Sequence, residues 1–112
     1  MRYSALSDVR VVDLTHYIAG PYATKLLADM GADVVKVEPV QGEGGRGLGP
    51  KRGSSDCDRG GLFAFLNLNK RGVTLNLKHP RGRELMTSLL EDADLLIENF
   101  ARRLSAEVGG EN

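Results

Sequence analysis

Several residue types are scarce in this 112-residue sequence, and each scarcity argues against a class of protein. The one cysteine, Cys57, has no partner for an internal disulfide, which is typical of the reducing cytoplasm. Aromatic residues make up 5% of the chain and no recognition motif for nucleic acid occurs, so we expect no nucleic-acid partner. No apolar run approaches the roughly 20 residues of a membrane span, and polar residues interrupt the region where a signal peptide would be apolar. We therefore expect a cytoplasmic protein without a membrane partner.

The abundant residues indicate a globular domain with an uneven distribution of charge. Hydrophobic residues make up 41% and charged residues 27% of the chain, and 112 residues allow one domain with a modest core. The formal net charge is zero, but residues 46–83 hold nine basic and two acidic residues, a balance of +7. Such a segment suits a compact polyanion, for example a nucleotide-type cofactor. A solvated loop with scattered Arg and Lys has the same composition, so charge alone leaves both interpretations open.

The first part of the chain predicts a strand, a helix and a second strand. Val9 to Leu14 is a nearly unbroken apolar run, typical of a parallel strand covered on both faces, and Asp33 to Glu38 is the second strand. Gly20 and Pro21 suit the beginning of the helix between them. The residues expected on the buried face of this helix are Ala23, Leu26, Leu27 and Met30. In such units ligands bind at the carboxyl ends of the strands, so the turn from Thr15 to Gly20 should face a ligand.

The second half of the chain repeats this order. Gly72 to Leu77 is a strand candidate, a helix begins at Pro80, and Leu95 to Ile97 is a further strand. The residues expected on the buried face of that helix are Leu85, Leu89, Leu90 and Ala93. Val40 to Gly61 holds eight glycines and predicts a flexible loop, while Leu62 to Leu68 fits either a short helix or an extended segment. Two such units in tandem predict an α/β fold, a Rossmann-like parallel sheet with flanking helices that forms part of a domain.

Short motifs with a family resemblance occur in order along the chain. They are Asp13-Leu14-Thr15, Ala19-Gly20-Pro21, the segment from Leu26 to Glu38, Asn69-Lys70-Arg71 and Glu98-Asn99-Phe100. Each is weak alone, but together, from about Leu6 to Gly109, they resemble the opening of the family III CoA-transferases. That family includes formyl-CoA transferase, carnitine CoA-transferase and the 2-methylacyl-CoA racemases. Its members are several times longer, so residues 1–112 resemble only their N-terminal, CoA-binding segment.

The resemblance implies an enzyme that moves CoA between carboxylic acids, with acyl-CoA and a carboxylic acid as substrates and no tightly bound cofactor. In the family an aspartate attacks the acyl-CoA thioester and forms a covalent anhydride, and this aspartate lies beyond the matched region. We therefore expect no catalytic residue in this chain. The resemblance also implies a homodimer in the full-length protein. Two alternatives stay open: a fragment of a 2-methylacyl-CoA racemase, and a non-catalytic remnant or interaction module with the same fold.

The resemblance also implies which residues contact CoA. Lys78 ends a Leu-x-x-Lys segment that contacts the adenine and phosphate end of CoA in the family, and it lies between a predicted strand and helix. Arg46 matches the arginine of an Arg-Gly-x-Gly-Pro loop and is a candidate phosphate ligand. The expected CoA contacts are Tyr17, Ile18, Arg46, Leu75, Asn76, Leu77, Lys78, Asn99, Phe100 and Ala101. Pro39 and Glu107 stand where many members have arginine, so two phosphate contacts of the family are not matched.

Three other features carry no chemistry in this interpretation. Gly42 to Gly47 matches the G-x-G-x-x-G pattern, but it follows the second predicted strand and not the first, so it does not predict a dinucleotide site. His16 and His79 have no partner at metal-ligand spacing, and we expect no metal site. Cys57 lies in a polar stretch without a helix terminus to activate its thiol, so it is not assigned as a nucleophile.

Overall fold

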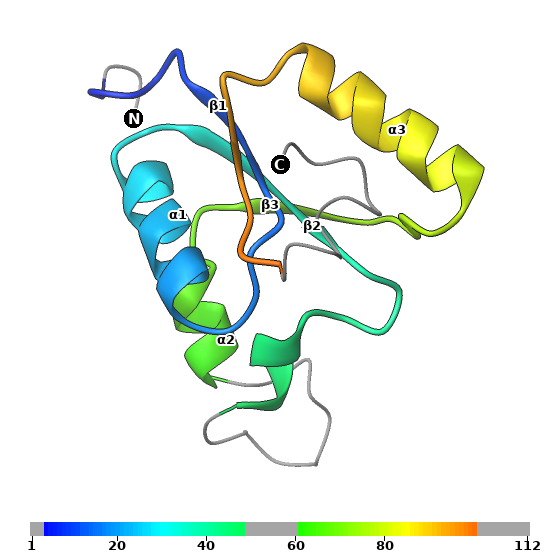
Figure 1. Cartoon of the computed structure of the whole chain (residues 1–112). Helices are drawn as coiled ribbons and strands as arrows, with labels where there is room; N and C mark the ends of the chain where they lie inside the picture. The colour runs from blue at the N-terminus through cyan, green and yellow to red at the C-terminus, as the bar shows by residue number, and fades with distance from the viewer. Residues whose placement is uncertain (1–3, 49–60, 101–112) are drawn as a thin grey trace.

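The computed structural model describes residues 4–48 and 61–100, which form a sheet with helices on both faces (Figure 1). In chain order the elements are β1 (Arg10–Asp13), α1 (Ala19–Asp29), β2 (Asp33–Glu38), the 3₁₀ helix η1 (Gly44–Gly47), α2 (Gly61–Leu66), β3 (Arg71–Thr74), α3 (Pro80–Glu91) and β4 (Leu95–Ile97). The predicted order of strand, helix and strand therefore occurs twice.

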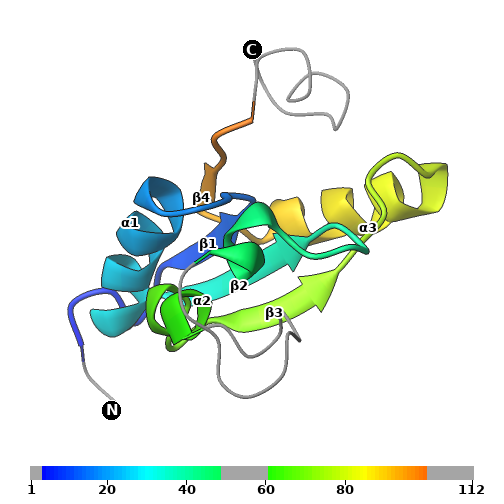
Figure 2. The ribbon, with the colours of Figure 1, turned by 90° about the horizontal axis from the view of Figure 1, so that it is seen from below.

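The sheet is parallel throughout, and its strands lie in the order β3-β2-β1-β4. β1 is central, because Val11 pairs with Val34 of β2 on one side and with Leu95 of β4 on the other. The chain moves outward from β1 through β2 to β3, and α3 then returns it to β4 (Figure 2). This confirms the predicted α/β fold. Because the strands are parallel, their carboxyl ends meet at one edge of the sheet.

The two faces of the sheet carry separate hydrophobic cores. On the α1 face, Val11 and Val34 pack with Ala28 and Ala32. The core on the α3 face consists of Val12, Leu14, Val37, Leu75 and Met86. Successive strand residues point to opposite faces, which explains why the apolar run of β1 contributes Val11 to one core and Val12 to the other. The near-continuous hydrophobic sequence of β1 is thus the signature of a strand covered on both faces.

The face of α1 that packs on the sheet differs from the apolar face that the sequence predicted. Its buried residues are Pro21, Thr24, Lys25 and Ala28. Leu26 and Met30, which were expected inside, are 41% and 47% exposed. Ala23 is also exposed, and Leu27 is the member of the predicted set that packs against the core. The prediction for this face was therefore wrong for all but Leu27.

The polar residues on the inner face of α1 explain this error, because their polar groups have partners. The Thr24 hydroxyl donates a hydrogen bond to Asp13 on β1 at 2.7 Å. Lys25 keeps its ammonium 2.6 Å from Asp29 and 4.8 Å from the ring centroid of Phe65. Burial of a polar group costs little when its hydrogen bonds are satisfied, so hydrophobicity alone does not orient this helix.

α3 packs on the sheet through Met86 and Gly82, with Leu89, Leu90 and Ala93 partly buried as predicted. Leu85 was expected inside but is 40% exposed, because the contact face is centred on Met86. Gly82 allows a close approach: a Cβ at this position would lie 1.9 Å from the carbonyl oxygen of Asn76. The start of α3 is thereby held directly against the segment that follows β3.

Within the described residues, the glycine-rich stretch contains regular structure. Gly44 to Gly47 form η1. The segment Leu62 to Leu68, which fitted either a short helix or an extended segment, is helical as far as Leu66, where α2 ends. Residues 49–60 of the predicted flexible loop lie outside the described residues. None of the described helices is long and apolar enough to cross a membrane.

Candidate functional site

A cavity of about 370 Å³ lies at the carboxyl edge of the sheet. Its lining residues come from the ends of all four strands: Leu14, His16, Val37, Glu38, Pro39, Val40, Gln41, Leu75, Asn76, Leu77, Lys78 and Phe100. Five of these residues, Leu75 to Lys78 and Phe100, belong to the set that the sequence analysis expected to contact CoA. The cavity thus brings together two predicted segments from β3 and β4 that are far apart in the sequence.

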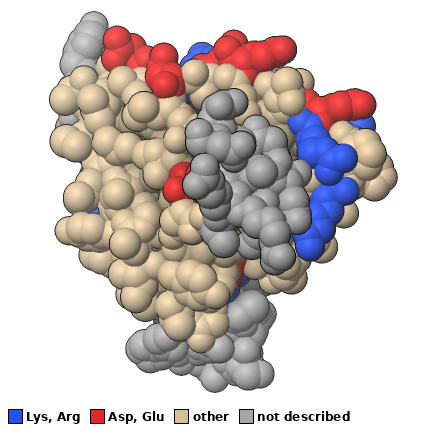
Figure 3. Space-filling model, viewed as in Figure 1, with Lys and Arg blue, Asp and Glu red and all other residues tan. Residues whose placement is uncertain are grey.

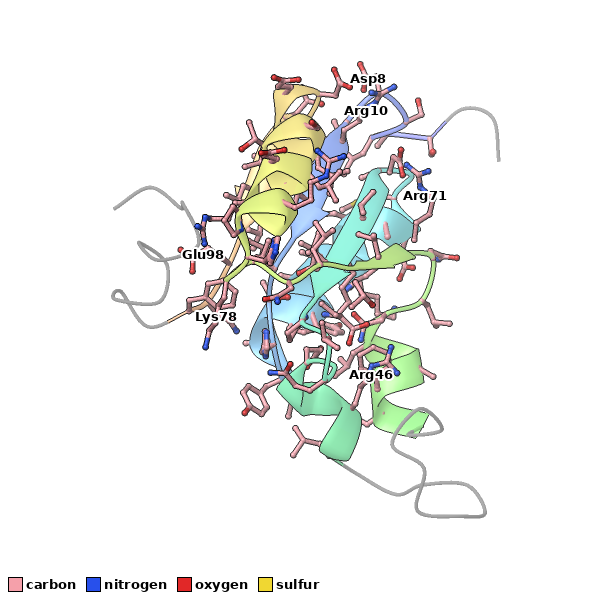
Figure 4. All side chains as sticks on the ribbon, turned by 90° about the vertical axis from the view of Figure 1, so that its right-hand side faces the viewer. Asp8, Arg10, Arg46, Arg71, Lys78 and Glu98 are labelled. Atoms are coloured by element: carbon pink, nitrogen blue, oxygen red, sulfur yellow. The ribbon has the colours of Figure 1, made fainter. Side chains whose placement is uncertain are left out.

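A larger cavity, of about 510 Å³, lies at the opposite, amino edge of the sheet between the strands and α3. Its rim includes Arg10, Asp33 and Arg71, which are the first residues of β1, β2 and β3. Figure 4 shows Arg10 and Arg71 at this end and Lys78 at the other. Ligands of open parallel sheets bind outside the carboxyl ends of the strands, so the smaller cavity is the candidate site.

Local hydrogen bonds shape the turn between β3 and α3. Asn76 Oδ1 accepts a hydrogen bond from the N–H of Lys78 at 3.1 Å, which is the turn that a short amide side chain favours. His79 caps α3, since its Nδ1 accepts from the N–H of Arg81 at 3.0 Å. Arg83 donates to the carbonyl of Leu77 at 3.1 Å. Lys78 is left exposed at the cavity, and Figure 3 shows basic side chains gathered beside the start of α3.

Asn99 and Phe100 follow β4 and lie at or next to the cavity, and only Phe100 lines it. The side-chain amide of Asn99 forms two hydrogen bonds with the backbone of His16. Oδ1 accepts from the N–H of His16 at 3.0 Å, and Nδ2 donates to the carbonyl of His16 at 2.9 Å. The N–H of Phe100 donates to Glu98 at 2.8 Å, and the Phe100 ring lines the cavity. Asn99 therefore positions the chain after β1, while Phe100 faces the cavity. Ala101 lies outside the described residues.

Tyr17 and Ile18 follow His16 in the chain but, unlike His16, are not among the lining residues of the cavity. Ile18 is the exposed N-cap residue of α1. Tyr17 has a φ of 73°, a left-handed conformation that is unfavourable by about 1–2 kcal/mol for a residue with a Cβ. Its N–H donates to Glu43 Oε1 at 3.0 Å, and its ring packs so closely on Gly44 that a Cβ there would lie 2.3 Å from the ring. These contacts stabilise the strained turn.

Arg46 lies in an ion pair. Its Nε and one terminal nitrogen donate to the two carboxylate oxygens of Glu38 at 2.7 Å and 2.9 Å, and its guanidinium carbon is 4.0 Å from the ring centroid of Phe63. Burial by itself raises the pKa of Glu38, but the hydrogen bonds from Arg46 and from the Glu43 N–H lower it below its usual value. Arg46 and Lys78 line different cavities and lie on opposite sides of this end of the sheet (Figure 4).

A buried charged cluster centred on Asp13 lies beneath the turn between β1 and α1, and it was not predicted from the sequence. Asp13 is fully buried and accepts hydrogen bonds from the N–H of Thr15 at 2.8 Å, the hydroxyl of Thr24 at 2.7 Å and Nζ of Lys70 at 2.9 Å. Burial by itself raises the pKa of Asp13, but nearby Lys36 and the hydrogen bonds lower it below its usual value. The carboxylate is therefore ionised at neutral pH.

The cluster extends from Asp13 to η1 through Lys36. Nζ of Lys36 donates to the carbonyl of Thr15 at 3.0 Å and forms an ion pair with Glu43 Oε2 at 2.9 Å. The other oxygen of Glu43 accepts from the N–H groups of Tyr17 and Gly45. Asp13, Lys36 and Glu43 thus hold the backbone of the β1–α1 turn from below, next to the candidate site.

The described residues contain no group of three or more His, Cys, Asp or Glu side chains arranged to hold a metal ion. The candidate cavity instead offers an exposed ammonium, aliphatic and aromatic walls, and backbone groups of the segment after β3. These are the features of a site for an organic ligand that carries negative charge.

The sequence itself matches the family model of CoA-transferase family III over residues 6–110, nearly the whole chain. The chain belongs to CoA-transferase family III. This confirms the resemblance that the short motifs indicated.

Two curated CoA-transferases and one solved structure show how much of a longer protein the chain spans. It is 47% identical over 100 residues to formyl-CoA:oxalate CoA-transferase of Streptomyces coelicolor, a match that covers 89% of this chain and 24% of that enzyme. It is 50% identical over 97 residues to succinyl-CoA:mesaconate CoA-transferase of Haloarcula marismortui, a match that covers 86% of this chain and 24% of that enzyme. A CAIB/BAIF family protein from Brucella suis has a similar structure, with a TM-score of 0.85 and 34% identity over 97% of this chain and 29% of its own. The chain thus spans about a quarter of the length of the curated relatives.

Proposed function

We propose that this chain is the CoA-binding part of an acyl-CoA:carboxylate CoA-transferase, which moves CoA between carboxylic acids. The observation that supports this most is the cavity at the carboxyl edge of the sheet, which Leu75, Asn76, Leu77, Lys78 and Phe100 line together. These residues were expected to contact CoA on the basis of family resemblance. The two relatives named above act on formyl-CoA and oxalate, and on succinyl-CoA and mesaconate. An acyl-CoA and a carboxylic acid are therefore the proposed substrates.

Each part of the cavity matches a part of CoA. The ammonium of Lys78 suits a phosphate group, since hydrogen bonds to ionised groups are about twice as strong as neutral ones. Phe100 and the leucines at positions 75 and 77 form an apolar wall for the adenine ring. Arg46, already paired with Glu38, is proposed as a phosphate ligand only where a polyphosphate competes for that ion pair. Tyr17 and Ile18 are proposed to contact CoA from the edge of the cavity.

The carboxylates near the cavity support the expectation that the catalytic aspartate lies outside this chain. Glu38 lines the cavity but is paired with Arg46, and Asp13 is fully buried and hydrogen-bonded to Lys70. An ionised carboxylate whose oxygens are held by an ion pair and hydrogen bonds is a weaker nucleophile for a thioester than a free one. We propose that the chain supplies binding, that the acid acting on the thioester belongs to another part of the full-length protein, and that this protein is a cytoplasmic homodimer.

Isothermal titration calorimetry with CoA tests this proposal on the chain itself. We expect measurable binding that weakens with added salt, because a charged contact contributes to it. Lys78→Ala should weaken binding about tenfold or more, since a hydrogen bond to a charged group contributes about 1.5–3 kcal/mol. Arg10→Ala removes the same charge at the amino edge and should leave the affinity unchanged. A folded chain that releases no heat with millimolar CoA would instead support the non-catalytic remnant.

A further inference from the structure

His16 is held at both its backbone and its ring. Asn99 fixes the backbone, since it accepts from the N–H of His16 at 3.0 Å and donates to its carbonyl at 2.9 Å. The Phe100 ring packs edge-on against the imidazole, with centroids 5.7 Å apart and planes at 70°. On the η1 side, Nδ1 of His16 accepts a hydrogen bond from the N–H of Gly44 at 3.2 Å. The ring therefore has a fixed orientation relative to the cavity that it lines.

These contacts also determine where the imidazole carries its proton. A backbone N–H can only donate, so Nδ1, which accepts from Gly44, carries no proton. Burial lowers the pKa of His16 despite the nearby carboxylates, and the ring is neutral at pH 7. A neutral imidazole with a bare Nδ1 has its proton on Nε2. Nε2 is thus an N–H donor, and it has no hydrogen-bond partner within residues 4–48 and 61–100.

We propose that the Nε2–H of His16 donates a hydrogen bond to a neutral carbonyl oxygen of the ligand bound in this cavity. This inference rests on the proposed function, because it takes the ligand to be CoA or an acyl-CoA. A buried carbonyl loses its hydrogen bonds to water and needs a donor in the site. A neutral N–H supplies that donor without the charge that Lys78 offers to phosphate. CoA offers carbonyl oxygens in its pantetheine amides and, when acylated, in its thioester.

Three ligands, two variants of His16 and one control variant test this proposal by calorimetry. The ligands are CoA, acetyl-CoA, and adenosine 3′-phosphate 5′-diphosphate, which lacks the pantetheine arm. His16→Asn keeps an oxygen near the Gly44 N–H but removes the Nε2 donor, whereas His16→Gln places an amide N–H near the position of Nε2. Loss of one neutral hydrogen bond predicts binding about 3- to 10-fold weaker in H16N, with partial recovery in H16Q. His79→Asn makes the same change at the α3 N-cap, where asparagine also caps well, and should not alter the affinity.

The outcomes separate the two sources of the carbonyl. A loss in H16N with both CoA and acetyl-CoA identifies a pantetheine amide, and a loss with acetyl-CoA alone identifies the thioester. Equal affinities of wild type and H16N for all three ligands overturn the inference, and so does an equal loss for the nucleotide without pantetheine. ¹⁵N spectra of the ring should show a protonated Nε2 whose signal moves on binding. A folded wild-type chain that binds none of the ligands refutes the proposed function itself, and this inference with it.

Discussion

Replacing Asp13 by asparagine should destabilise the chain more than any comparable change at its surface. The substitution keeps the size of the side chain but removes the negative charge that faces Nζ of Lys70 at 2.9 Å. The side chain of Lys70 is 2% exposed, so its ammonium would be left buried without a counter-charge. Removal of one partner of a buried ion pair costs about 3–5 kcal/mol. Most domains are stable by about 5–15 kcal/mol, so much of the stability would be lost.

Urea unfolding followed by circular dichroism measures this effect. With a dependence on urea of about 2 kcal/mol per M, the midpoint of Asp13→Asn should fall by about 2 M. Asp33→Asn on β2 is the matched control, because it makes the same change in an ion pair with Arg71 that is exposed. The side chain of Asp33 is 42% exposed and that of Arg71 is 71% exposed. An exposed pair contributes about 0–1 kcal/mol, so this midpoint should move little.

A double substitution tests the reason for the loss. Lys70→Met together with Asp13→Asn removes both charges, so the double variant should be more stable than the sum of the single losses predicts. If Asp13→Asn is no more destabilising than Asp33→Asn, or if the double variant shows only additive losses, the structural role assigned to the cluster is wrong.

Two further predictions concern acid and packing. The pKa values of Asp13 and Glu38 are lowered in the folded state, so their contribution to the free energy of unfolding is present at neutral pH and is lost as the pH falls through the folded pKa values. The pKa of His16 is also lowered in the folded state. Below about pH 6.5 the unfolded chain therefore binds this proton more readily than the folded chain, and stability falls. Urea midpoints should therefore fall continuously from pH 7 to pH 3, and a flat profile would contradict these directions. Gly82→Ala should cost about 1–3 kcal/mol, because its Cβ would meet Asn76 at 1.9 Å. Gly72→Ala, where nothing lies within 4 Å, is the control and should leave the free energy of unfolding within about 1 kcal/mol of wild type.

The elements of the fold were predictable because their signals are local. Apolar residues mark β1, β2 and β4, and Gly20, Pro21 and Pro80 mark where helices begin. The exposed edge strand β3 ends at Thr74, three residues before the end of the strand predicted for residues 72–77. The orientation of α1 was not predictable in the same way, because its inner face carries Thr24 and Lys25. Their burial depends on partners that only the folded chain supplies.

The candidate site shows the same division between local and long-range information. The segment Leu75 to Lys78 is continuous, and the structure places it in one cavity as a unit. Asn99 was expected to face CoA, but its amide binds His16, 83 positions away. Asp13 and Lys70 are 57 positions apart, and no local pattern links them. Such pairs exist only once the parallel strands are aligned, so sequence spacing does not reveal them.

Binding of CoA at the carboxyl edge of the sheet can be mapped by titrating the ¹⁵N-labelled chain with CoA and following the amide shifts by NMR. We expect the largest shifts in residues 75–78, at His16 and at Phe100, and no shift of the amide signals of Arg10, Asp33 and Arg71 at the amino edge. Shifts concentrated at the amino edge, or no shifts from a folded chain at millimolar CoA, would contradict binding of CoA at the carboxyl edge.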